Sequence, residues 1–101
     1  MLPNEGKLHS AAAKGDRAQA LWSNPELQEA FDKVEADLLA RWKESTYGQA
    51  ALREVLWAQF AALQEARAAI KHVIDNGKVA RTRLEELGAL ASRTINRMRG
   101  R

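Results

Sequence analysis

The sequence predicts an all-α protein built around a long antiparallel helical hairpin. Ala, Leu, Glu, Arg, Lys and Gln dominate the 101 residues, and these are the strongest helix formers. β-Branched and aromatic residues, which favour strands, are scarce. Apolar residues recur three and four positions apart through most of the chain, as on one face of an α-helix.

The first 23 residues predict a flexible N-terminal segment. Gly6 and Gly15 interrupt it, and small or polar residues supply little that could fill a core. Asp16 is a good N-cap, so we expect a short helix from there through Trp22.

The first helix of the hairpin is expected over residues 24–44. Asn24 is a favoured N-cap, and Pro25 suits the first helical position. Trp22 precedes the cap, where it can pack back onto the first turns as a hydrophobic staple. The apolar stripe of this helix consists of Leu27, Phe31, Val34, Leu38 and Trp42.

The second helix of the hairpin is expected over residues 49–76. Its apolar stripe consists of Leu52, Leu56, Phe60, Leu63, Ile70 and Ile74. Asn76 and Gly77 then predict a helix stop, because Asn and especially Gly tolerate the left-handed conformation that ends many helices.

A third helix is expected over residues 79–98, with a thinner stripe of leucines. The connection before it is so short that this helix either folds back or continues with a kink, and the sequence leaves both open. The predicted helical domain therefore covers residues 24–98, followed by a basic tail at 99–101.

The sequence predicts no enzyme and no catalytic, cofactor or metal site. The chain has no cysteine, no Glu-x-x-His pair and no Gly-rich phosphate loop. His9 and His72 have no further ligand or nucleophile at helical spacing, so we interpret both as ordinary surface or boundary residues. No small-molecule substrate is expected.

The composition also predicts a protein that is made and kept in the cytosol or packed into something assembled there. No apolar run approaches the roughly 20 residues that a membrane-spanning helix needs. The N-terminus lacks the charged and then apolar pattern of a signal peptide. A domain of this size buries only about 60–70% of the surface that its unfolded chain exposes, which favours an oligomer or a bound partner.

Two tryptophans lie on either side of the predicted turn of the hairpin. Trp42 and Trp57 either cap the closed end of the core, or one of them is exposed as an anchor for a partner. Trp57 is the better candidate for the anchor, because it lies one residue away from the stripe that contains Leu56 and Phe60.

Charge is distributed unevenly along the chain. Residues 24–47 hold six acids and three bases, whereas residues 77–101 hold two acids and seven bases. The candidate partner-binding arginines at the basic end are Arg81, Arg83, Arg93, Arg97, Arg99 and Arg101. They could dock an acidic protein surface, including the acidic helix of a neighbouring copy, contact phosphates of a nucleic acid, or remain solvated.

The stretch from Asn24 to Ala80 resembles small helical proteins encoded by tailed bacteriophages and prophages. The resemblance rests on four segments: Asn24 to Phe31, Arg41-Trp42-Lys43, Leu56-Trp57, and Ile74 to Ala80. It covers a little over half of the chain and implies a virion or assembly role by association, with no catalytic residues to carry over.

These observations lead to one expected function and two alternatives. We expect a non-enzymatic phage structural or assembly-accessory protein that docks through its helical surfaces to a larger virion assembly or to copies of itself. The alternatives are a nucleic-acid-binding accessory protein that uses the arginine-rich end, and a small inhibitor or adaptor of a host protein.

Overall fold

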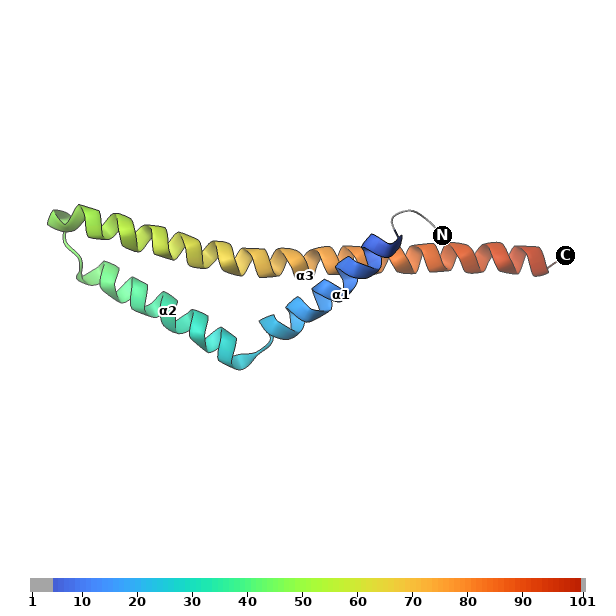
Figure 1. Ribbon diagram of the computed structural model, residues 1–101, viewed down its shortest axis with the longest axis horizontal. Helices are drawn as coiled ribbons and strands as arrows, with labels where there is room; N and C mark the ends of the chain where they lie inside the picture. Colours follow the sequence, from blue (N-terminus) through green and yellow to red (C-terminus); the bar gives the residue numbers. More distant parts are fainter. Residues whose placement is uncertain (1–4, 101) are drawn as a thin grey trace. The chain divides into compact units, whose positions relative to one another are not determined.

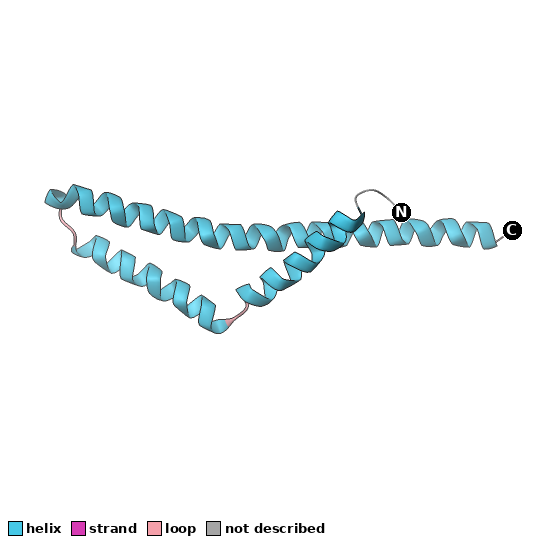
Figure 2. Ribbon diagram, viewed as in Figure 1, coloured by secondary structure: helices cyan, strands magenta, loops and turns pink. Residues whose placement is uncertain are grey.

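The computed structural model describes residues 5–100, and these residues confirm the all-α class. Helix α1 spans Glu5–Trp22, α2 spans Pro25–Glu44, the 3₁₀ turn η1 spans Tyr47–Gln49, and α3 spans Ala50–Arg99 (Figure 1). No strand occurs in this described part of the chain (Figure 2).

Helix α2 begins and ends within one residue of the helix predicted over 24–44, because local capping fixes both ends. The Asn24 side chain accepts a hydrogen bond from the backbone N–H of Leu27 at 3.2 Å. The backbone N–H of Ser45 donates to the carbonyls of Arg41 and Trp42, and so satisfies groups at the C-terminus of the helix.

The prediction of a separate third helix over 79–98 is wrong. Helix α3 runs for 50 residues without interruption through the predicted stop at Asn76 and Gly77. No residue of the described chain has a positive φ, so Gly77 keeps the right-handed helical conformation. Gly77 has no side chain, and this allows α1 to approach α3 closely at this position. Gly77 does not end the helix.

The N-terminal segment also differs from the prediction. A helix of 18 residues begins at Glu5, where we expected flexible chain with a short helix from Asp16. Residues 1–4 of that predicted segment lie outside the described residues. The buried positions of α1 are Ala12 and Gly15, so this helix packs through small residues and has no stripe of large apolar side chains that would indicate it in the sequence.

The contacts divide the chain into two units, and α3 contributes to both. The first unit contains the chain up to Gln19 and from His72 onward, and the second contains Ala20–Lys71. Each unit is described separately below.

In the second unit, α2 packs against the first half of α3. Leu38 and Leu56 are buried there at 8% and 3% exposure. Arg67 reaches across to Asp32 at 3.1 Å and to Glu35 at 2.5 Å. Residues early in α2 thus contact residues late in this part of α3, which is the order of antiparallel neighbours.

In the first unit, α1 crosses α3 at two glycines. A Cβ built on Gly77 falls 2.6 Å from the Cα of Gly15, a separation that real Cβ atoms essentially never show. Buried Ala12, Ile74 and Ala80 surround the crossing. Arg81 of α3 donates a hydrogen bond to Asp16 of α1 at 2.5 Å.

Candidate protein-binding surfaces

The second unit carries an apolar hollow between α2 and α3, which we call the tryptophan surface. Its volume is about 250 Å³. Trp57 is 63% exposed there, Leu39 is 43% exposed, and Trp42 is 38% exposed. The residues of the tryptophan surface are Leu38, Leu39, Trp42, Leu56, Trp57 and Phe60.

The helical register explains why this surface is exposed. Leu38 and Leu56 are buried between the two helices, and Leu39 and Trp57 each follow a buried leucine by one residue. A step of one residue rotates a side chain by about 100° around the helix, which carries it to the edge of the packed face. The ring of Trp57 stacks on that of Phe60, with centroids 6.4 Å apart and planes 24° from parallel.

One side of the tryptophan surface is closed by an arginine. The guanidinium of Arg53 lies over the ring of Trp42 at 4.2 Å and over the ring of Tyr47 at 5.6 Å. Such cation–π contacts fix the ring of Trp42 and cover one of its faces. No arginine or lysine within residues 5–100 lies over the Trp57 ring in this way, and Trp57 is the more exposed of the two tryptophans.

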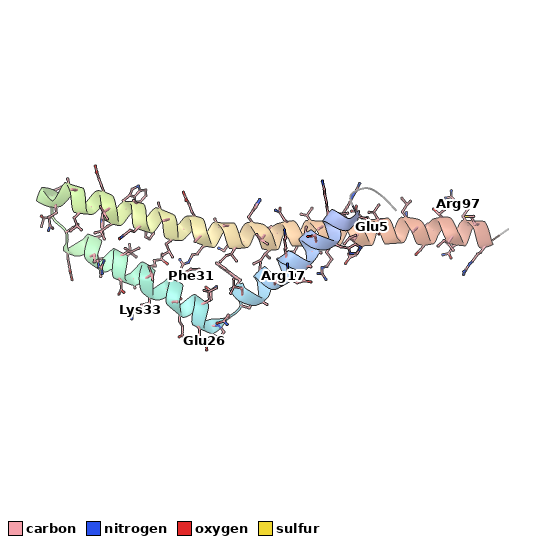
Figure 3. All side chains as sticks on the ribbon, viewed as in Figure 1. Glu5, Arg17, Glu26, Phe31, Lys33 and Arg97 are labelled. Carbon is pink, nitrogen blue, oxygen red and sulfur yellow. The ribbon has the colours of Figure 1, made fainter. Side chains whose placement is uncertain are left out.

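Two of the acidic residues of α2 form ion pairs with Arg67 of α3. The Arg67 side chain is 15% exposed, binds both Asp32 and Glu35, and lies 5.4 Å from the centre of the Phe31 ring. Figure 3 shows Phe31 on the side of α2 that faces α3, with Glu26 and Lys33 on the opposite side. The acids that remain without a basic partner in the described chain include Glu26 on this outer face.

The six candidate arginines differ in whether they have a carboxylate partner. Arg81 pairs with Asp16, and Arg83 pairs with Glu86 at 3.4 Å, so both already have carboxylate partners within the first unit. The three arginines in the last turns of α3 have no carboxylate partner among residues 5–100. These are Arg93, Arg97 and Arg99.

The remaining candidate, Arg101, lies outside the described residues. The three unpaired arginines belong to a segment of α3, residues 88–99, which we call the arginine arm. The first part of this arm, as far as Ile95, lines a hollow together with Glu5 and His9 of α1. Arg97 lies near the C-terminal end of α3 (Figures 1 and 3).

The arginine arm also carries an apolar stripe. Ala91, Ile95 and Met98 follow one another at helical spacing and continue the face by which α3 packs on α1 at Gly77 and Ala80. Ile95 is 50% exposed and Met98 is 74% exposed. The arm therefore presents apolar side chains and unpaired positive charge together.

The described residues hold no cluster of side chains suited to binding a metal ion. No three His, Cys, Asp or Glu side chains within residues 5–100 gather closely enough to hold a metal ion. His9 lies 3.9 Å from Glu5 one turn away, and His72 is exposed on α3. None of the helices described is both long and apolar enough to cross a membrane.

Many large apolar side chains within residues 5–100 are exposed, among them Val79 at 69% and Met98 at 74%. The buried apolar side chains in the described part are few, namely Ala12, Leu38, Leu56, Ile74 and Ala80.

The fold and these surfaces define an all-helical protein with two exposed, chemically different faces, one apolar and aromatic, the other apolar and cationic. Comparisons with models of protein families, with curated proteins and with solved structures find no match to this chain.

Proposed function

We propose that this chain is a non-enzymatic assembly-accessory protein that docks to other proteins through the tryptophan surface. The observation that carries the proposal is the exposure of Trp57 beside an apolar hollow that no side chain of the described chain fills. Tryptophan is among the residues most enriched at the energetic centres of protein interfaces.

The size of the hollow supports a protein partner over a small molecule. Small-molecule sites usually enclose about 300–1,000 Å³ and add several precisely placed polar groups. This hollow is smaller, at about 250 Å³, and its lining residues are all apolar. It is suited to one large apolar side chain of a partner, whose full burial contributes about 1.5–3 kcal/mol.

The setting that we propose is the assembly of a bacteriophage particle. This part rests on the resemblance of residues 24–80 to small helical phage proteins. A docking role fits a chain with little core of its own, because association buries the apolar area that folding leaves exposed.

The test is the presence of the chain in purified particles. Particles from source cells that express a tagged copy should contain that copy after gradient purification, as detected by mass spectrometry. Trp57→Ala should reduce its incorporation strongly, whereas Val79→Ala, at another exposed apolar residue of α3, should leave incorporation unchanged. Equal incorporation of the wild type and Trp57→Ala would contradict the proposal.

A second candidate function is nucleic-acid binding through the arginine arm. The three unpaired arginines favour it, because Arg neutralises phosphates without sequence preference. With Arg101 included, four phosphate contacts to duplex DNA predict a log–log salt slope of about −3 to −4. A titration of labelled DNA at increasing salt separates this candidate from protein docking, and a truncation after Ala91 should abolish the binding.

A further inference from the structure

We infer that copies of this chain associate head to tail, with the arginine arm of one copy docked on the tryptophan surface of the next. This inference rests on the proposed function, since it names a second copy as one partner of the same surface. Two independent properties of the chain support it: its charge distribution and the complementary size of its apolar parts.

Charge is complementary between the two units of the chain. The second unit, Ala20–Lys71, holds eight acids and six bases, a net charge of −2. The rest of the chain holds ten bases and five acids, a net charge of +5. Opposite charges of this kind steer the arm of one copy toward the second unit of another and disfavour contact between two arms.

An unpaired acidic residue flanks the tryptophan surface, and an unpaired arginine flanks the apolar stripe of the arm. Glu54 precedes Trp57 by three residues on α3, so it flanks the tryptophan surface, and it has no basic partner in the described chain. On the arm, Arg99 follows Ile95 by four residues and therefore flanks the apolar stripe. An arm that inserts Ile95 can thus bring Arg99 close to a carboxylate of the partner copy.

The apolar parts are complementary in size. The hollow has room for one large side chain, and the arm offers Ile95 and the more exposed Met98. Methionine is unbranched and polarisable, so it fills irregular apolar spaces and packs well against aromatic rings such as that of Trp57.

A copy inside a head-to-tail chain uses both of its surfaces. Contacts of this type close into a ring or extend as a filament, whereas a symmetric dimer stops at two copies.

The experiment uses two variants of the full chain, each with one working surface. Ile95→Asp places a charge on the stripe of the arm, where Ile95 is 50% exposed, and circular dichroism checks that the variant keeps the helical content of the wild type. Trp57→Asp does the same at the tryptophan surface. Asn96→Asp is the matched control for the arm, because it adds the same charge one residue away from the stripe.

Sedimentation velocity at low salt measures the result. The wild type should grow beyond a dimer as its concentration rises, and each Asp variant alone should weaken association at least about tenfold, as expected when a central contact of an interface is lost. An equimolar mixture of Ile95→Asp and Trp57→Asp should form a dimer that does not grow further, and Asn96→Asp should associate more strongly than Ile95→Asp.

Three results would overturn the inference. A wild type that remains monomeric at high concentration refutes self-association. A wild type that stops at a dimer, together with a mixture of the two variants that does not associate, indicates a symmetric contact. Association that survives both Asp substitutions places the contact elsewhere. If Trp57→Ala is nevertheless lost from purified particles, the proposed docking function stands without head-to-tail association.

Discussion

Replacing Gly77 by alanine should separate α1 from α3 and destabilise the first unit. The new Cβ would lie 2.6 Å from the Cα of Gly15 and 3.2 Å from the carbonyl oxygen of Ala11. Both neighbours are backbone atoms, which cannot rotate away as a flexible side chain can. Carbon atoms prefer separations of about 3.5–4.0 Å, so the helices must move apart by about 1 Å.

The expected cost follows from two opposing effects. Overpacking of a closely packed site costs about 1–3 kcal/mol. Alanine in a helix interior is favoured over glycine by about 1 kcal/mol, which offsets part of that cost. Gly88→Ala is the matched control, because Gly88 lies in the same helix and its Cβ would meet nothing within 4 Å.

The difference between these two alanine variants isolates the clash, because the gain in helix propensity is common to both. We expect Gly77→Ala to be less stable than Gly88→Ala by about 1–3 kcal/mol. In a chain of this size each 1 kcal/mol shifts the melting temperature by roughly 4–8 °C, which thermal denaturation followed by circular dichroism resolves easily.

Hydrogen exchange locates the effect. Amides of residues 5–19 should exchange faster in Gly77→Ala, and those of α2 should be unchanged. Gly15→Ala should have the same effect. The double variant should lose less stability than the sum of the two single losses, because both substitutions disrupt the same close contact. If Gly77→Ala melted as high as Gly88→Ala, α1 would not be seated against this glycine.

Three further predictions concern the second unit. Arg67→Met should lower its free energy of unfolding by roughly 1–3 kcal/mol, with the loss shrinking at high salt, and urea denaturation at two salt concentrations checks both. Asn24→Ala should cost about 1 kcal/mol by removing the N-cap of α2, whereas Asn24→Asp should retain most of the stability in the same assay. A fully buried Phe that is replaced by Ala costs about 3–5 kcal/mol, and Phe60→Ala should cost less because its ring is partly exposed. Trp57→Ala should destabilise the unit still less, and equal losses for the two variants would contradict the assigned burial.

Helix α2 could be predicted closely because its ends are set by neighbouring residues. The Asn24 cap and the hydrogen bonds of Ser45 each join atoms within a few positions of one another, and these are visible in the sequence. For Trp57 the sequence left a capping role and an exposed role open, and only the choice of Trp57 over Trp42 as the exposed residue followed from its position one residue beyond an apolar stripe.

The course of α3 could not be predicted in the same way, because the role of Gly77 depends on a distant segment. A glycine at a helical position is compatible with a stop, where it adopts positive φ, and with a close helix crossing, where its small size matters. Only the approach of Gly15, 62 positions earlier in the numbering, distinguishes the two cases. The same contact explains why the sequence does not predict the start of α1 at Glu5, since this helix packs through glycine and alanine.

The division into units has a spectroscopic consequence. All six aromatic residues of the chain, Trp22, Phe31, Trp42, Tyr47, Trp57 and Phe60, belong to the second unit. Intrinsic fluorescence and near-ultraviolet dichroism therefore report on that unit alone, whereas far-ultraviolet dichroism reports on the helices of both. Each unfolding experiment thus carries an internal comparison, because the two optical signals coincide only if both units melt in a single cooperative step.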